Sequence, residues 1–240
     1  MELHIAANIE KLNIALADWL VQYAAEVLEQ KDRFTIALSG GRTPKLLHEL
    51  LAGDAYKNKF DWVKWHVFFG DERFVPFADE RNNAKMAFDT LLNHVPIPAD
   101  QVHIMQTENI SPEDSAMAYE KLLHQYFDPS ESSFDLVLLG IGDDGHTLSL
   151  FPGLPVVHVS NVWAASLWLP PQDMFRVTLT HAIVNHAAAV AFVVAGSTKA
   201  TVLNEILNGD YNPDLYPAQI IQPVPGELHW FVDEAAAAEL

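Results

Sequence analysis

The sequence predicts an α/β protein: a single-domain three-layer sandwich with a mainly parallel, Rossmann-like sheet. Short continuous apolar runs alternate with amphipathic segments along the chain. That alternation is typical of βαβ units whose strands are buried on both faces. No Pro-rich or Gly-rich linker divides the 240 residues, so we expect one domain over residues 1–240.

The individual elements follow from the spacing of apolar residues. Strands are expected at 34–38, 65–69, 102–105, 134–139, 162–166, 175–179, 187–195 and 228–232. Helices are expected at 8–30, 45–51, 82–92, 112–125 and 198–207, where apolar side chains recur at helical intervals. Asn8 and Ser111 are suited to cap two of these helices, and Pro44 favours a first helical turn.

Composition excludes several classes of function. Fourteen Lys and Arg residues stand against 32 Asp and Glu, and this net charge of −18 disfavours binding to nucleic acid or an anionic membrane. The chain has no cysteine, which excludes disulfides, thiolate metal sites and cysteine nucleophiles. The N-terminal residues do not read as a signal peptide, and no apolar run is long enough to span a membrane. We therefore expect a cytoplasmic protein.

Four segments that follow predicted strands hold most of the unusual combinations of glycine, acid, histidine and cation. They are residues 39–43, 70–73, 140–146 and 196–199. In open α/β sheets, ligands bind beyond the carboxyl ends of the strands. The coincidence predicts that these segments meet and form the functional site.

The first of these segments has the chemistry of an anion-binding turn. Its two glycines allow a close backbone approach, its hydroxyls can donate hydrogen bonds, and the helix expected next offers free N–H groups. The Gly-Lys-Ser/Thr ending of a P-loop is missing, and a plain strand–helix turn is the alternative interpretation. The segment reads Ser39, Gly40, Gly41, Arg42 and Thr43.

The second segment places Asp71 and Glu72 before Arg73 at a strand end. An arginine can hold a phosphate through paired N–H donors, and an acid can serve as a base or orient a hydroxyl. A local ion pair is the alternative. From Met86 onward the only cations are Lys121, Arg176 and Lys199. The last two flank apolar strand-like runs and are candidates for structural or functional roles, whereas Lys121 lies in a helical pattern.

The third segment, at 140–147, formally contains G-x-G-x-x-G after a strand, which is the dinucleotide-binding fingerprint. We reject that interpretation because two aspartates inside the turn would repel a pyrophosphate and no acid lies about 20 residues on. The segment is better interpreted as a glycine turn that presents Asp144 and His146. Imidazole is the usual general acid/base at neutral pH.

Other catalytic templates fail. The chain has no G-x-S-x-G elbow, which makes a serine hydrolase a poor fit. His48 and Glu49 are not followed by the second histidine of H-E-x-x-H, and His181 and His186 are five residues apart, which is poor spacing for one helix face. The sequence predicts no metal site and no cofactor.

At this point the residues resemble a known family. The blocks SGGRTP, FFGDERFVP, RNNAKMA, LLGIGDDGHTLSLFPG, FRVTLT, VAGSTKA and ELHWFVDEAAA occur in the order seen in 6-phosphogluconolactonases. The resemblance runs from about Leu38 to the C-terminus, and the GDER and GxGxDGHTxSLFPG blocks are its specific parts. It implies that residues 1–240 are one 6-phosphogluconolactonase-like domain, similar in fold to glucosamine-6-phosphate deaminases/isomerases.

One position separates these two relatives. The deaminases resemble DGHxxxNEPG, with a Glu before the proline that assists ring opening, whereas this chain has Phe151 before Pro152. The missing acid favours the lactonase. This sequence departs from the family pattern at two places. Arg42 stands where the family usually has a small hydroxyl residue, and the stretch after Gly153 lacks the expected acidic character. Both departures bear on the details of substrate binding rather than on the class of reaction.

The resemblance implies hydrolysis of 6-phospho-D-glucono-1,5-lactone to 6-phospho-D-gluconate in the oxidative pentose phosphate pathway, without metal, cofactor or covalent intermediate. His146 is expected to move the proton of the attacking water, while Asp71 or Asp144 orients the imidazole or the sugar hydroxyls. The phosphate is expected on Arg73, Lys199 and the 39–43 backbone, with Arg42 and Arg176 as secondary candidates.

The expected partner is a small-molecule phosphosugar lactone, bound by a monomer or weak homodimer, with no nucleic acid and no membrane involved. Two alternatives remain open at this point. One is an aldose–ketose isomerase or deaminase acting on phosphosugars. The other is a non-catalytic phosphosugar sensor, although the chain has no spare length for a helix-turn-helix output module.

Overall fold

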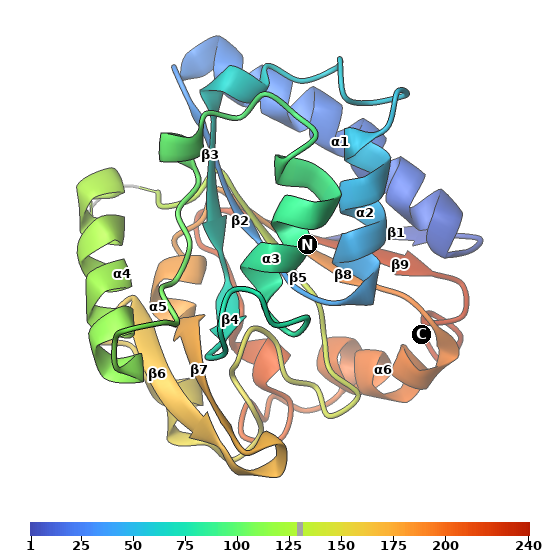
Figure 1. Ribbon diagram of the computed structural model, residues 1–240. Helices are drawn as coiled ribbons and strands as arrows, with labels where there is room; N and C mark the ends of the chain where they lie inside the picture. The colour runs from blue at the N-terminus through green and yellow to red at the C-terminus, as the bar shows by residue number, and fades with distance from the viewer. Residues whose placement is uncertain (129–131) are drawn as a thin grey trace.

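The fold is built on a six-stranded sheet whose strands all run parallel, in the order β1-β9-β8-β5-β2-β3. The computed structural model describes residues 1–128 and 132–240 (Figure 1). The strands of this sheet are β1 (Glu2–Ala6), β2 (Phe34–Leu38), β3 (Trp65–Phe69), β5 (Leu136–Leu139), β8 (Ala189–Val194) and β9 (Glu227–Asp233).

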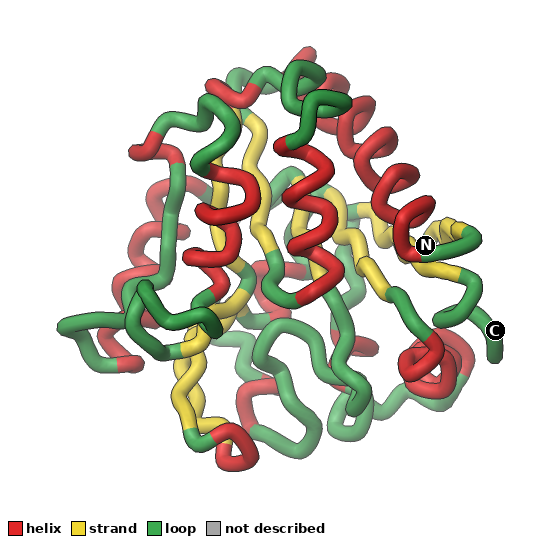
Figure 2. Tube along the Cα trace, turned by 45° about the vertical axis from the view of Figure 1, so that its right-hand side comes forward, coloured by secondary structure: helices red, strands yellow, loops and turns green. Residues whose placement is uncertain are grey.

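Helices cover both faces of the sheet, which confirms the predicted three-layer α/β architecture. One face carries α1 (Ile9–Gln30), α2 (Arg42–Ala52) and α3 (Asn83–Ala87), which lie in front of the strands in Figure 2. The other face carries α4 (Pro112–Tyr126), α5 (His181–Val184) and α6 (Ala200–Asn208). Strand β5 contributes Leu136 and Leu138 to one core and Val137 and Leu139 to the other. Burial on both faces explains its unbroken apolar run.

A second, antiparallel sheet of three strands joins the first where β3 ends. It consists of β4 (Asp71–Arg73), β7 (Met174–Leu179) and β6 (Ala164–Leu169) in that order. Gly70 is the junction: its N–H donates to the carbonyl of Leu38 at 2.8 Å, and its carbonyl accepts from the N–H of Leu179 at 2.7 Å. The segment 70–73, expected to be a loop, is therefore largely a strand held by β7.

Most predicted elements are confirmed, with shifted ends. Asn8 and Ser111 cap α1 and α4 through their side chains, which accept from the N–H groups of Lys11 and Asp114. The helix expected at 45–51 begins at Arg42. The helix expected at 82–92 divides into α3 and a π-helical turn at Phe88–Leu92.

One predicted strand does not form, and one strand of the main sheet was not predicted. No strand forms at 102–105, where the structure has only a single bridge between Val67 and Val102. The carbonyl of His103 accepts instead from the hydroxyl of Tyr119 at 3.2 Å, so it takes no part in a ladder. Strand β1 was not expected, although its residues complete the sheet edge beside β9. Across the described ranges, no helix combines the length and apolarity needed to cross a bilayer.

A buried carboxylate fastens the centre of the sheet. Asp135 is 2% exposed and precedes β5. Its Oδ2 accepts from the backbone N–H of Thr35 at 2.8 Å and from the Thr35 hydroxyl at 2.7 Å, and its Oδ1 lies 2.5 Å from Nζ of Lys31. The carboxylate therefore links the end of α1, strand β2 and the start of β5.

We expect Asp135→Ala to lower the free energy of unfolding by about 3 kcal/mol, because it leaves a buried N–H and hydroxyl of Thr35 without their charged acceptor. Lys31→Met is the matched control. The Lys31 side chain is 49% exposed, so we expect a loss below about 1 kcal/mol. Urea denaturation of both variants measures the difference, and equal losses would contradict the central role of Asp135.

Candidate active site

A cleft of about 290 Å³ opens at the carboxyl ends of the parallel strands. All four strand-end segments singled out in the sequence contribute to its wall, as ligand binding in an open α/β sheet requires. Strands β2, β5 and β8 are neighbours in the sheet, which is why segments far apart in the sequence meet here. The lining includes Ser39, Gly40, Gly41, Asp71, Arg73, Asn83, Gly140, Ile141, Gly142, His146, Leu148, Phe151, Gln172, Arg176 and Lys199.

His146 and Asp144 form a hydrogen-bonded pair in the turn after β5. Nδ1 of His146 lies 2.6 Å from Oδ1 of Asp144, which also accepts from the His146 backbone N–H at 3.1 Å. Burial acts to raise the pKa of Asp144, but the hydrogen bonds and charge of His146 outweigh it and hold that pKa below its usual value. Asp144, rather than Asp71, is therefore the acid that orients the imidazole.

Gly142 is required by this pair. A Cβ at position 142 would lie 2.0 Å from Nδ1 of His146 and 2.4 Å from Oδ1 of Asp144, so any side chain would displace both groups. The loop is closed by the Gly142 N–H, which donates to the carbonyl of His146 at 2.8 Å. The glycines of this turn thus make room for a histidine–aspartate pair, which agrees with our rejection of the dinucleotide fingerprint.

Phe151 packs against the imidazole. The two ring centroids lie 4.2 Å apart with the planes tilted by 30°, and Phe151 is buried. The aromatic ring therefore contacts one side of the imidazole and helps to fix its orientation. The residue before Pro152 is thus an apolar side chain that contacts His146, the acid/base candidate.

Two guanidinium groups face the cleft from the second sheet. Arg73 of β4 and Arg176 of β7 are directly paired across the antiparallel ladder, so their side chains lie on the same face. Arg176 is 3% exposed, and its nearest charge is Oδ2 of Asp71 at 3.6 Å. Nε of each arginine is buried without a hydrogen-bond partner in the described part of the chain. Because two positively charged guanidinium groups lie side by side here, this wall of the cleft is suited to bind an anion.

Lys199 reaches the cleft from the turn after β8. Its Nζ lies 2.5 Å from Oδ1 of Asp143, and that carboxylate lies in the neighbouring turn after β5. The turn is anchored from the opposite side by Asp233, whose two carboxylate oxygens accept from the Gly196 N–H at 2.9 and 3.1 Å. Asp143 thus holds the ammonium group at the cleft and competes with any incoming anion.

The first segment lies at the open N-terminus of α2. Gly41 is the N-cap residue of α2. Because it has no side chain that could cap the helix, the first N–H groups of α2 remain available to a ligand. Gly40 allows the close approach of Asn83, because a Cβ there would lie 1.9 Å from Oδ1 of that side chain. Ser39, Gly40 and Gly41 line the cleft, whereas Arg42 and Thr43 do not.

Arg42 lines a neighbouring hollow of about 280 Å³ instead. That hollow shares Gly41, Arg73 and Asn83 with the cleft, and Lys45, Arg81 and Lys85 also line it. The structure therefore does not bring Arg42 into the cleft that Arg176 and Lys199 line.

Asp71 has a structural setting different from that of Asp144. It is buried, and its Oδ2 accepts from the hydroxyl of Ser149 at 2.6 Å. Asn83 donates from Nδ2 to the Asp71 carbonyl at 2.9 Å. The Asp71 carboxylate is fixed on the cleft wall beside Arg176, where it can position that guanidinium and accept from a ligand hydroxyl.

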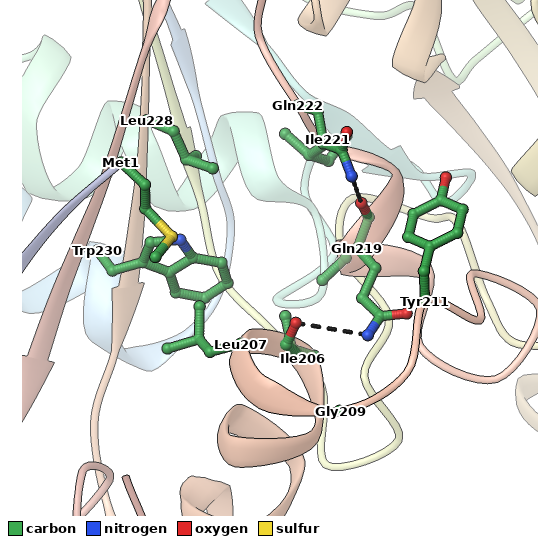
Figure 3. A pocket seen from close by; sticks show the side chains of 11 residues that line it. Met1, Ile206, Leu207, Gly209, Tyr211, Gln219, Ile221, Gln222, Leu228 and Trp230 are labelled. Carbon is green, nitrogen blue, oxygen red and sulfur yellow. Dashed lines mark hydrogen bonds between the residues drawn. The ribbon is translucent and has the colours of Figure 1, made fainter.

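A further hollow of similar size is a poor candidate for chemistry. Figure 3 shows it between α6 and β9, with a volume of about 300 Å³ and apolar walls that include Ile206, Leu228 and Trp230. Gln219 closes one side by donating to the carbonyl of Ile206 at 3.4 Å. Its lining includes no acidic, basic or histidine side chain. The cleft with His146 is therefore the candidate active site.

Comparison with known proteins places the chain in a family. The family described as glucosamine-6-phosphate isomerases/6-phosphogluconolactonase matches residues 7–230. A 6-phosphogluconolactonase from Synechocystis sp. is 41% identical over 219 residues, which cover 90% of this chain and 88% of that protein. The chain belongs to the glucosamine-6-phosphate isomerase/6-phosphogluconolactonase family. The resemblance noted in the sequence is confirmed.

Solved structures in the glucosamine-6-phosphate isomerase/6-phosphogluconolactonase family share the whole fold. The 6-phosphogluconolactonase from Trypanosoma brucei superposes with a TM-score of 0.87 at 28% identity, covering 100% of this chain and 98% of that one. A monomeric glucosamine-6-phosphate deaminase superposes with a TM-score of 0.85 at 18% identity over 100% of both chains. The second likeness shows the fold alone, so the choice between activities depends on the site.

Sequence reasoning missed three groups of this family site. Asn83 and Ser149 hold Asp71, and Gln172 accepts a hydrogen bond from Arg176. Asn83 and Ser149 do lie inside blocks that carry the family resemblance, but their contacts depend on the second sheet, which the sequence did not predict. Gln172 lies in the β6–β7 turn and gave no signal.

Glu72 lies behind the cleft wall rather than in it. It is 0% exposed, and its carboxylate accepts from the backbone N–H groups of Arg73, Asn83 and Ala84 at 2.7–2.8 Å. Burial raises its pKa from 4.5 to about 7, although these three hydrogen bonds act in the opposite direction. Glu72 therefore fixes the start of α3 and the register of β4.

This raised pKa predicts a pH-dependent stability. Because the folded state binds the Glu72 proton more tightly than the unfolded state, its contribution is complete below pH 4.5 and is lost as the pH rises to about 7. We expect the loss to be about 3 kcal/mol, at 1.36 kcal/mol per pKa unit. Urea denaturation from pH 4.5 to pH 7.5 measures it, with Glu72→Gln as the comparison. Identical pH slopes in the two proteins would contradict the assignment.

Proposed function

We propose that this chain hydrolyses 6-phospho-D-glucono-1,5-lactone to 6-phospho-D-gluconate, with His146 as the general acid/base. The observation that carries the proposal is the His146–Asp144 pair at 2.6 Å in a cleft that also presents Arg73, Arg176 and Lys199. The 41% identity to a 6-phosphogluconolactonase supports the same activity. The product is the substrate of the next step in the oxidative pentose phosphate pathway.

The pairing determines which nitrogen of His146 reacts. Asp144 accepts from Nδ1, so the neutral ring carries its proton there and presents the Nε2 lone pair. Nε2 takes a proton from water as that water attacks C1 of the lactone, and it returns the proton to the ring oxygen as the C1–O5 bond breaks. Asp144 stabilises the imidazolium between these two steps.

The tetrahedral intermediate carries negative charge on the former carbonyl oxygen, which needs donors. Backbone N–H groups of the glycine-containing segments are natural candidates for these donors. Those of Gly142 and Gly145 already donate within the turn, to His146 and Gly142. Other donors on the cleft wall include the 39–41 backbone and the cations Arg73, Arg176 and Lys199, which can serve the oxyanion and the phosphate.

Phosphate binding fixes the lactone for attack. The substrate phosphate is anionic and the chain carries a net charge of −18, so the attraction must be local. Ser39–Gly41, which lead into α2, and Lys199 all line the cleft and suit this group. Asp71, fixed by Ser149, is placed to accept from a sugar hydroxyl. The cytoplasmic location and the monomer or weak homodimer stay predictions.

Deamination of glucosamine 6-phosphate is the competing activity within the family. The resemblance places its assisting acid at the position of Phe151, and here that ring packs on His146. A coupled assay in which glucose-6-phosphate dehydrogenase generates the lactone distinguishes the two. We expect the lactone to disappear faster than it does spontaneously, with no ammonia released from glucosamine 6-phosphate. Ammonia release without lactone hydrolysis would reverse the assignment.

For the acid/base role, we expect His146→Ala to lower kcat by about 10²–10⁴-fold with little effect on KM. Asp144→Asn keeps a hydrogen-bonding group beside Nδ1 but removes the charge that stabilises imidazolium, so we expect a smaller loss in kcat. Steady-state lactonase kinetics measure both. An unchanged kcat in His146→Ala would exclude the proposed role.

For phosphate binding, we expect Lys199→Ala to raise KM by about 10–100-fold, the value of one charged hydrogen bond, with kcat nearly preserved. Lys121→Ala is the matched control, because Lys121 lies exposed on α4, away from the cleft. The same lactonase assay gives both constants. A fall in kcat alone would instead place Lys199 at the reacting centre.

A further inference from the structure

A second cluster of reactive side chains lies at the edge of the main sheet, at the opposite end of the strands from the cleft. Glu2 and His4 belong to β1, and His229 belongs to its neighbour β9. Glu2 and His229 are directly paired in the parallel register. All three side chains therefore project from the same face of two adjacent strands.

The three potential ligand atoms form a compact triangle. Nε2 of His4 lies 3.3 Å from Nδ1 of His229, and Oε2 of Glu2 lies 3.7 Å from the first and 3.5 Å from the second. Ligands bound to zinc at 2.0–2.1 Å in tetrahedral geometry lie about 3.3–3.4 Å from one another. An ion just above the plane of this triangle can lie about 2.1 Å from all three atoms, which matches zinc–ligand bond lengths and leaves a fourth position open above it.

The surroundings of His229 resemble those of a metal ligand. Its second nitrogen, Nε2, lies 3.1 Å from Oε2 of Glu227, so Nε2 carries the proton and Nδ1 presents its lone pair to the triangle. The ring is 2% exposed and packs against Trp19 of α1 at 4.9 Å. Aromatic packing also holds His4, which stacks on Phe231 at 4.3 Å.

We propose that Glu2, His4 and His229 bind a divalent transition metal ion of the Zn²⁺ type, with Glu227 orienting His229. Two imidazoles and one carboxylate suit zinc, cobalt, nickel or copper rather than magnesium or calcium, which prefer all-oxygen sites. The exposed side of Glu2 leaves the fourth position to water. The ion would cross-link β1 to β9, and the proposal departs from the sequence-based expectation that the chain holds no metal.

The competing interpretation is a metal-free relay of hydrogen bonds. In it, Nε2–H of His4 donates to Nδ1 of His229, and Nε2–H of His229 donates to Glu227. This relay gives Nε2 of His4 and both nitrogens of His229 hydrogen-bond partners without a metal ion. It predicts that adding metal gives no heat of binding and leaves Tm unchanged. Metal titration therefore separates the two interpretations.

The experiment titrates ZnCl₂ into untagged, chelator-treated protein and follows the heat of binding and Tm. We expect one equivalent to bind, and Tm to rise by about 5–10 °C at a hundredfold excess over Kd. CoCl₂ should give the visible absorption of a four-coordinate site with nitrogen ligands.

Three variants locate the ion. His4→Phe removes a ligand but keeps the stack on Phe231, and we expect it to weaken Zn²⁺ binding at least tenfold. Glu227→Gln should weaken it by about 10–100-fold, the usual effect of losing a ligand's hydrogen-bond partner. His146→Ala is the control for the other histidine–carboxylate pair and should bind as the wild type does.

Lactonase activity reports on folding, because none of the three edge residues contributes to the cleft. His4→Phe should retain full activity, and Glu2→Gln serves as a second ligand variant if it does not. Zn²⁺ binding that survives in His4→Phe and is lost in His146→Ala would place the ion in the cleft and overturn the proposal. An unchanged Tm with a featureless Co²⁺ spectrum would establish the hydrogen-bond relay instead.

Discussion

The parallel pairing of the buried strands β2, β5 and β8 is the constraint on which the site depends. These strands are neighbours in the sheet and run in one direction, so the turns that follow them open on the same edge. Each strand is apolar on both faces because helices, and on one side a second sheet, cover it. The polar groups of these three central segments are thereby placed at the strand ends, where side chains can reach a ligand.

The cleft presents a group of positively charged side chains, although the net charge of the whole chain is negative. The protein carries −18, yet Arg73 and Arg176 stand side by side on one wall and Lys199 on another. Asp71 and Asp143 each lie close to one cation and limit the repulsion without cancelling it. Physiological salt screens both the repulsion by the acidic surface and the attraction of the cleft beyond about 8 Å, so the cleft cations attract an anionic ligand mainly at short range. The arrangement favours a small phosphorylated molecule over an extended polyanion.

The sequence predicted the strand-end segments and the histidine–aspartate turn correctly, because both depend on local patterns: apolar runs, glycines and the residues that follow them. It could not predict the second sheet. Strand β4 is three residues long and contains charged residues whose burial depends on β7, about 100 residues later. For the same reason the contacts of Asn83 and Ser149 with Asp71 were missed. Arg42 was assigned with its segment, but the rotation of α2 turns it toward a neighbouring hollow.

The order of strands also sets the order in which the protein can be completed during synthesis. Strand β1 is synthesised long before β9 (Glu227–Asp233), the strand with which it pairs in the described part of the sheet. Until β9 is made, the backbone donors and acceptors of β1 have no partner strand, a condition in which nascent chains depend on chaperones and are prone to misassociation. This edge of the sheet is therefore completed later than the pairing of β2, β3 and β5, although β1 precedes all three in the chain.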